Sequence, residues 1–213
     1  MRIGILGGTF DPVHLGHLWI ASAAAESLGL DQVRFVPAAQ NPLKDRGPVA
    51  SADQRVAMLR LAIGGDDRFV VDPVEIDRAE APKAAEGGGP SYMVDTLGQL
   101  VADDPQSEWF LIVGGDSVAT FDRWRDPQRI LSMATLAGVR RGGEGAIDYS
   151  PLAGVATAGQ LQSAMEHEIA MPAIELSSRD LRRRIASGGS VRYFVPAAVR
   201  QLIEAEGLYG WGG

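Results

Sequence analysis

The feature that most constrains the fold of this chain is the alternation of short apolar segments with longer segments of helical periodicity. The apolar segments have the length and composition typical of strands, and they cover 3–6, 33–37, 69–76, 109–113, 135–140 and 169–176. Amphipathic segments such as 16–28 and 92–102 lie between them. Strands that alternate with helices of roughly 10 to 15 residues predict a parallel sheet covered on both faces. The sequence therefore predicts an α/β fold, a Rossmann-like, doubly wound parallel sheet.

The length of the chain and its loops predict the domain organisation. A chain of 213 residues fits one domain of generous size, and no linker or internal repeat divides it. We expect 1–213 to form a single domain whose last part, about 177–209, is helical. There Ser177 opens a basic helix, and Pro196 begins a terminal amphipathic helix that Gly207 ends. A capping box of Ser51 and Gln54 predicts another helix, and 77–90 is expected to be a loop.

Composition and charge exclude several functions. The chain has no cysteine, which excludes disulfides, thiolate metal sites and cysteine nucleophiles. A net charge of −7 argues against a nucleic-acid partner, because a phosphate backbone is held by a broad basic surface. No run of about 18 apolar residues is present, and we expect no signal peptide, because the start of the chain lacks a long apolar stretch and a small-residue cleavage site. We therefore expect a cytoplasmic protein without a membrane-spanning helix, and the sequence leaves open whether it forms a homo-oligomer.

The most informative motif is the segment 7–17, GGTFDPVHLGH, which directly follows the first apolar segment. Gly7 and Gly8 let backbone amides approach an anion closely. His14 and His17 are three residues apart at a helix start and therefore share one face, with room for a ligand over Gly16. The helix start adds free N–H groups and the positive end of a dipole. The motif predicts a phosphate cradle with two imidazole donors, and it differs from the dinucleotide and P-loop fingerprints.

Further polar residues follow other predicted strands. Asp116 comes after a strand that ends in two glycines, and Ser177 and Ser178 begin a helix that carries Arg182 one turn later. Hydroxyls and amides at a helix start can hold phosphate, and an arginine can reach the same anion. Ligands of parallel α/β sheets bind beyond the carboxyl ends of the strands. We therefore expect these residues and segment 7–17 to form one site.

Several motifs together resemble a known family. GGTFDPVHLGH is similar to the first signature of the nucleotidyltransferase superfamily with an H-x-G-H motif, and 177–182, SSRDLR, is similar to its second, I-S-S-T-x-I-R. Between them, 91–97, SYMVDTL, and Gly114-Gly115-Asp116 through Trp124 resemble the S-Y-T-x-D-T and G-A-D…W segments of bacterial nicotinate-nucleotide adenylyltransferases. The resemblance also includes 191–196, VRYFVP, and extends to about residue 209.

The resemblance implies a reaction and a set of site residues. In that family the phosphate of nicotinate mononucleotide attacks the α-phosphorus of ATP, and Mg²⁺ is expected on the ATP phosphates and not in a protein cage. Both substrates are small molecules. The implied catalytic residues are His14, His17, Lys44 and Arg182. The implied ATP-binding residues are Gly7, Gly8, Thr9, Phe10, Gly16, Ser177 and Ser178. The implied nicotinate nucleotide-binding residues are Ser91, Tyr92, Met93, Thr96, Asp116 and Trp124. In the family the tryptophan at position 124 stacks on the pyridine ring, and backbone amides near Tyr92 and Met93 hold the nicotinate carboxylate.

The chain also departs from the family pattern. Arg179 stands in place of the usual Thr of the second signature, Gly115 in place of Ala, and Met93 in place of Thr. Arg179 either points outward, adds a contact to the triphosphate, or slows the enzyme. Three alternatives remain open: nicotinamide mononucleotide as acceptor, pantetheine phosphate as acceptor, or an ATP sensor without turnover. The pantetheine-phosphate family is shorter and lacks the S-Y-x-x-D-T and G-x-D…W segments.

Overall fold

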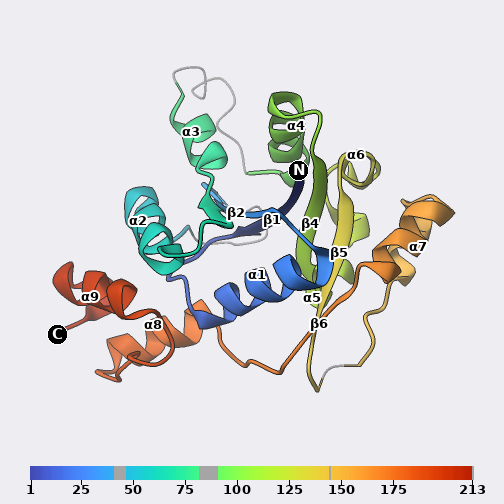
Figure 1. Cartoon of the computed structure of the whole chain (residues 1–213). Helices are drawn as coiled ribbons and strands as arrows, with labels where there is room; N and C mark the ends of the chain where they lie inside the picture. The colour runs from blue at the N-terminus through green and yellow to red at the C-terminus, as the bar shows by residue number, and fades with distance from the viewer. Residues whose placement is uncertain (41–46, 82–90, 144, 213) are drawn as a thin grey trace.

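The computed structural model describes residues 1–40, 47–81, 91–143 and 145–212. Its centre is a parallel sheet with strand order β3-β2-β1-β4-β5-β6 (Figure 1). The strands are β1 (Arg2–Gly8), β2 (Gln32–Pro37), β3 (Phe69–Val71), β4 (Glu108–Gly114), β5 (Thr135–Arg141) and β6 (Ile169–Met171). The predicted doubly wound parallel sheet is confirmed, and its strand order is the one found in Rossmann folds.

Side chains of β1 point alternately into two cores, one on each face of the sheet. Ile3 and Ile5 belong to one core and Leu6 to the other. The core that contains Leu6 is covered by α1 (Leu15–Leu28), α2 (Ala52–Ile63), α8 (Ser178–Ala186), α9 (Ala197–Ala205) and the 3-10 turn η4 (Leu208–Gly210). The opposite core is covered by α3 (Val74–Glu80), α4 (Met93–Asp103), α5 (Gly115–Val118), α6 (Pro127–Met133) and α7 (Ala158–Glu166), with the turns η2 (Phe121–Arg123) and η3 (Ser150–Gly154).

Local sequence signals explain where the first two helices begin or end. The capping box predicted before α2 is present: the Ser51 side chain accepts from the Gln54 amide at 3.2 Å, and the Gln54 side chain accepts from the Ser51 amide. Helix α1 ends at Gly29, which has φ of 58°, a left-handed conformation that glycine adopts without strain. Helix α1 therefore begins and ends within about one residue of the prediction.

Two predicted strands are shorter than expected, and a proline explains each. The segment 69–76 was expected to be one strand, but β3 ends at Val71 and α3 begins at Val74. Pro73 has no N–H for a strand ladder, and the Asp72 side chain accepts from the Val74 amide at 3.2 Å, which favours a helix start. The segment 169–176 was also expected to be a strand, but β6 ends at Met171, just before Pro172. The loop expected over 77–90 is helical up to Glu80, and 82–90 lie outside the described residues.

The C-terminal part is helical as predicted and lies beside α1 and α2 (Figure 1). The terminal helix α9 ends at Ala205, and Gly207, with φ of 60°, leads into the turn η4. There the Tyr209 hydroxyl donates to Asp11 Oδ1 at 2.9 Å and connects the end of the chain to the loop after β1. Within the described residues, no helix has the length and apolarity that crossing a membrane requires.

The order of the strands determines where a ligand site forms. Strand β1 lies between β2 and β4, so the chain leaves β1 towards one edge of the sheet and later returns to its other side. At such a switch point the connections after the two neighbouring strands run to opposite faces of the sheet, and a crevice opens at the carboxyl ends. In this chain the crevice lies where Gly7 and Gly8 end β1 and Gly114 ends β4.

Candidate active site

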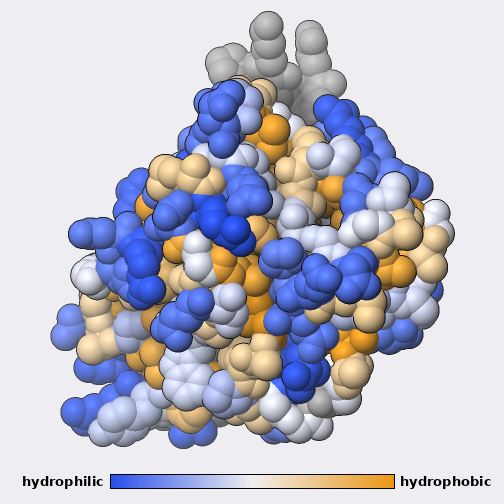
Figure 2. All heavy atoms as spheres, turned by 45° about the vertical axis from the view of Figure 1, so that its right-hand side comes forward, coloured by the Kyte–Doolittle hydropathy of each residue, from blue (hydrophilic) through white to orange (hydrophobic). Residues whose placement is uncertain are grey.

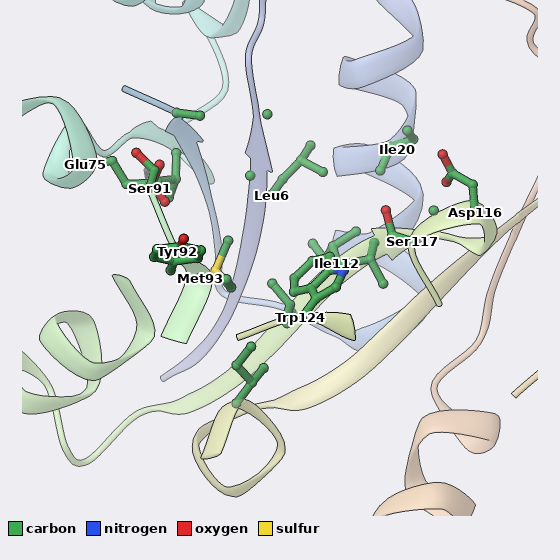
Figure 3. A pocket seen from close by; sticks show the side chains of 18 of the residues that line it. Leu6, Ile20, Glu75, Ser91, Tyr92, Met93, Ile112, Asp116, Ser117 and Trp124 are labelled. Carbon is green, nitrogen blue, oxygen red and sulfur yellow. The ribbon is translucent and has the colours of Figure 1, made fainter. Parts of the chain in front are cut away.

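A cavity of about 320 Å³ lies at the carboxyl ends of β1 and β4. Its floor is apolar and includes Leu6, Ile112 and Val113 from those two strands. Figure 3 shows Glu75, Ser91 and Tyr92 on one side of Leu6, and Ser117, Asp116 and Trp124 on the other. On the face shown in Figure 2, apolar residues reach the surface between hydrophilic ones. The cavity thus combines an apolar floor with a few polar groups at its rim, as small-molecule sites do.

The structure brings many of the predicted site residues to this cavity, but not all of them. The residues that line it are Gly7, Gly8, His17, Ser91, Tyr92, Met93, Asp116 and Trp124. The predicted residues that lie outside its lining are Thr9, Phe10, His14, Gly16, Thr96, Ser177, Ser178 and Arg182. Lys44 lies outside the described residues. We call Gly7, Gly8 and His17 the glycine–histidine part of the cavity, and Tyr92, Met93 and Trp124 its aromatic part.

The two predicted histidines form a stacked pair at the start of α1. Their ring centroids are 3.7 Å apart with an angle of 23° between the planes. His17 Nδ1 accepts a hydrogen bond from the His14 backbone N–H at 3.2 Å. A ring nitrogen that accepts carries no proton in a neutral imidazole, so the proton of a neutral His17 is on Nε2. His17 therefore has a defined tautomer and can offer one N–H donor to a ligand.

His14 supports this arrangement from a buried position. Its side chain is 5% exposed, and burial, followed by the positive charge of Arg141, lowers the pKa of His14 to about 4. His14 is therefore neutral at pH 7. Its Nδ1 is buried and has no hydrogen-bond partner among the described residues. His14 lies behind His17 as a neutral ring, and only His17 of the pair lines the cavity.

The glycines of segment 7–17 allow close packing of the side chains around them. A Cβ on Gly8 would lie 2.9 Å from the Phe10 ring, and a Cβ on Gly7 would lie 3.0 Å from Met93 Cε. Phe10 is 1% exposed, and its ring lies edge-on to His17 at 4.9 Å between centroids. The space over Gly16, expected to admit a ligand, is taken by the His14 ring, 3.0 Å from where a Cβ would be.

Arg182 and Ser178 hold the loop after β1. Arg182 Nη1 donates to the Asp11 carbonyl oxygen at 2.6 Å and lies 3.6 Å from Asp11 Oδ2. Ser178 Oγ donates to the Pro12 carbonyl oxygen at 2.9 Å. Ser177 caps α8 by accepting from the Asp180 amide at 3.1 Å. The side chain of Arg179 is exposed at the start of α8.

The aromatic part is built from the start of α4 and the segment after η2. Tyr92 is the N-cap residue of α4, and Met93 is its first residue. The Trp124 ring packs against Phe121 at 5.1 Å between centroids, and its Nε1 is buried without a hydrogen-bond partner in the part of the chain that the structure describes. The Arg125 guanidinium lies over the Tyr92 ring at 4.6 Å. Two aromatic rings and a cation thus border the same space.

Four charged residues of the cavity were missed in the sequence. They are Glu75 from α3, Arg123 from η2, Arg125 before α6 and Arg141 at the end of β5. Arg141 ends a strand, a position that parallel sheets favour for ligand contacts, so its place could have been expected. Arg123 and Arg125 flank Trp124, a residue already assigned to the site. Glu75 gave no such signal, because its segment has the apolar alternation of a strand.

Fold and site together define the class of this protein. The sequence model of the Cytidylyltransferase-like family matches residues 5–184, which places the chain among nucleotidyltransferases of that class. Two relatives with the name "Probable nicotinate-nucleotide adenylyltransferase" come from Rhodopirellula baltica and Thermus thermophilus. The first is 47% identical over 97% of this chain and 92% of its own length, and the second is 43% identical over 98% and 100%. The chain therefore belongs to the nicotinate-nucleotide adenylyltransferase family, and the resemblance of its motifs is confirmed.

Solved structures share the fold at much lower identity. Plasmodium falciparum nicotinic acid mononucleotide adenylyltransferase complexed with NaAD superposes with a TM-score of 0.70 at 13% identity, covering 99% of this chain and 98% of that chain. The same Plasmodium enzyme complexed with APC gives a TM-score of 0.69. At this identity the likeness shows the fold alone.

Proposed function

We propose that this enzyme transfers the AMP unit of ATP to nicotinate mononucleotide, giving nicotinate adenine dinucleotide and pyrophosphate. Beyond family membership, one observation carries the proposal. A single cavity at the switch point of the sheet contains both a glycine–histidine part suited to phosphate and an aromatic part suited to a flat ring. The two substrates of an adenylyl transfer must meet in one such space.

The reaction needs positioning and charge stabilisation more than a strong base. An oxygen of the acceptor phosphate attacks the α-phosphorus of ATP, the bond from that phosphorus to the oxygen bridging to the β-phosphate breaks, and pyrophosphate leaves with the electron pair. The nucleophile is already an anion, so no proton has to be removed from it. We assign to His17 Nε2 and to the amides near Gly7 and Gly8 the role of hydrogen-bond donors to the phosphates.

The other residues predicted for the ATP side that the structure describes do not line the cavity. In this proposal some of them act by shaping the loop after β1. Phe10 and Gly16 pack against the histidine pair, and Ser178 and Arg182 hold the loop by its carbonyl oxygens. His14 supports His17 as a neutral ring. Thr9, Ser177 and Lys44 remain assigned to the ATP side by family resemblance.

The aromatic part is proposed to hold the pyridine nucleotide. Trp124 would stack on the ring, and the amides at the start of α4, near Tyr92 and Met93, would hold the nicotinate carboxylate. Ser91 borders the same part of the cavity, and Asp116 can accept hydrogen bonds from ribose hydroxyls. The Arg125 guanidinium over Tyr92 adds positive charge beside this space, which favours an anionic ring over a neutral one.

Mg²⁺ is proposed to enter with ATP. Among the described residues, no group of three or more His, Cys, Asp or Glu side chains is placed to hold a metal ion. Mg²⁺ bound to triphosphate oxygens would neutralise part of the charge that develops on the leaving pyrophosphate. We also propose that 1–213 act as one nucleotidyltransferase domain with a helical part at about 177–209, and that the enzyme works in the cytoplasm. The proposal holds for a monomer and for a homo-oligomer.

One assay separates this proposal from its alternatives. Pyrophosphate release is measured with ATP and Mg²⁺ and, in turn, nicotinate mononucleotide, nicotinamide mononucleotide and pantetheine phosphate. We expect the highest kcat/KM with nicotinate mononucleotide. A higher value with either other acceptor would overturn the choice of acceptor. ATP binding without any release would favour the sensor, an alternative against which the intact His14, Gly16 and His17 weigh.

A further inference from the structure

A buried carboxyl group lies at the wall of the cavity beside its aromatic part. Glu75, from α3, is 4% exposed and lines the cavity (Figure 3). Its pKa is raised by burial, and hydrogen bonds from the Thr96 and Ser91 side chains and the charge of Arg78 oppose that shift. A buried carboxyl group is costly unless it is hydrogen-bonded. The groups that bond to Glu75 therefore have a structural reason to stay in place.

Thr96 is the first of these groups, and it occupies a different position from the one expected. Thr96 is 0% exposed and lies outside the cavity lining. Its hydroxyl donates to Glu75 Oε1 at 2.7 Å and accepts from Arg78 Nη2 at 3.0 Å. A hydroxyl that accepts from a cation donates more strongly to a carboxylate. Thr96 therefore connects Arg78 to Glu75 through hydrogen bonds, although it does not line the cavity.

Ser91 is the second group, and it connects two more segments. Its side chain accepts from the Gln40 amide at 3.3 Å, and its presence beside Glu75 lowers the pKa of that carboxyl group. The Ser91 amide in turn donates to the Gln40 carbonyl oxygen at 2.8 Å. Ser91 is thus held to the segment after β2 beside the carboxyl group that Thr96 bonds to the first turn of α4.

Tyr92 lies between these two anchors. Ser91 precedes it, and the Thr96 amide one turn later donates to the Tyr92 carbonyl oxygen at 3.2 Å. Tyr92, the N-cap residue of α4, and Met93, its first residue, line the cavity. We propose that Glu75, acting through Ser91 and Thr96, is a positioning residue that fixes the start of α4 in the orientation that binds the pyridine nucleotide. The inference rests on the proposed function, and it assigns Thr96 to this network in place of direct contact with substrate.

The sharpest test is Thr96→Val, which keeps the shape of the side chain and removes its hydroxyl. We expect the KM for nicotinate mononucleotide to rise about tenfold or more, the equivalent of losing one hydrogen bond to a charged group, while the KM for ATP changes less than about twofold. Thr96→Ser restores the hydroxyl and should restore the KM. Glu75→Gln, which removes the charge to which the Thr96 hydroxyl donates, should show the same split at smaller size and carries the test if Thr96→Val does not fold.

A matched control separates positioning from lost stability. Leu100→Val lies on the same helix, at a buried position that belongs to the apolar core and not to this network. It should lower the melting temperature without separating the two KM values. If Thr96→Val raises both KM values equally or neither, or if Thr96→Ser behaves like Thr96→Val, the positioning role is wrong. A wild-type enzyme that does not adenylylate nicotinate mononucleotide would contradict the proposed function itself, a result distinct from an unchanged KM split.

Discussion

Two buried carboxyl groups, Asp11 in the loop after β1 and Glu75 at the cavity wall, are held in different ways. Asp11, in the loop after β1, is 2% exposed and accepts from the amides of Val49 and Ala50 at 2.8 and 3.1 Å. It also accepts from the Tyr209 hydroxyl and lies 3.6 Å from the Arg182 guanidinium. Glu75 accepts from the Thr96 hydroxyl, which in turn accepts from the Arg78 guanidinium.

The difference suggests a division of tasks between the two parts of the cavity. The partners of Asp11 come from segments far apart in the sequence, at 49–50, 182 and 209, so Asp11 unites the loop, α8 and the C-terminus. Glu75 accepts from Thr96 in the first turn of α4, and Thr96 accepts from Arg78, so these contacts connect α3 to a single helix start. We infer that the glycine–histidine part depends on the whole fold for its rigidity. The aromatic part depends on one local network and can be altered by itself.

The largest expected effect is that of His17→Ala in the glycine–histidine part. Loss of a hydrogen-bond donor to the transition state should lower kcat by about 10²–10³. The KM for nicotinate mononucleotide should change little, because the aromatic part is intact. The measurement is steady-state kinetics with circular dichroism to confirm folding. His167→Ala, which removes a histidine outside the cavity, is the matched control, and near wild-type kcat in His17→Ala would remove His17 from the mechanism.

The second prediction concerns His14, the histidine behind His17, and the pH dependence of stability. Burial lowers the pKa of His14 from 6.5 to about 4, so below pH 6.5 the unfolded chain binds a proton that the folded chain does not. The contribution of His14 to the free energy of unfolding is fully present above pH 6.5 and is lost as the pH falls towards 4. The pKa gap corresponds to about 3 kcal/mol. Denaturant titrations of the wild type should show a slope in the free energy of unfolding, which falls as the pH is lowered from 7 to 4.

A variant and an opposing group make the pH test specific. His14→Asn should lack most of the slope, and an unchanged slope in that variant would show that His14 is not its source. Glu75 acts with the opposite sign: its pKa is raised in the folded state, so its contribution to stability falls as pH rises through that raised value. Repeating the titration in Glu75→Gln therefore removes the opposing contribution of Glu75.

The third prediction tests how far Asp11 depends on the C-terminus. Burial and the nearby Asp11 carboxylate raise the pKa of Tyr209, so its hydroxyl stays protonated and donates. Tyr209→Phe removes one hydrogen bond to a buried charge and should lower the free energy of unfolding by about 2 kcal/mol. Tyr193→Phe, at a side chain that is 78% exposed, is the control and should be neutral. Equal stability of the two variants would mean that the C-terminal contact does not stabilise the loop.

The sequence predicted the sheet and the position of the cavity because both depend on local signals. Buried strands appear as apolar runs, and Gly7, Gly8 and Gly114 mark where two of them end. The sequence could not predict how side chains share hydrogen bonds across the fold. Arg182, predicted to contact phosphate, donates to the Asp11 carbonyl oxygen, and Thr96, predicted to contact substrate, donates to Glu75. Such pairings depend on tertiary contacts between segments, and a motif shows only that a residue is near the site.

Pro73 shows a further limit of the same kind. The alternation of Val74 and Ile76 is equally compatible with a strand and with one face of a short helix, and the proline before them decides for the helix. That choice turns Glu75 towards α4 and the cavity. A single residue without a chemical role thus places the carboxyl group on which the aromatic part depends.

The smallest expected effect belongs to Trp124→Ala in the aromatic part. Aromatic stacking contributes about 0.5–1.5 kcal/mol beyond burial, so the KM for nicotinate mononucleotide should rise up to about tenfold while the KM for ATP stays nearly constant. Trp19→Ala, at an exposed tryptophan outside the cavity, is the matched control. Because Trp124 Nε1 has no hydrogen-bond partner among the described residues, the ring is held by packing against Phe121, and Trp124→Phe should restore most of the affinity. An equal rise in the KM values for both substrates in Trp124→Ala would mean that the two parts of the cavity do not act separately.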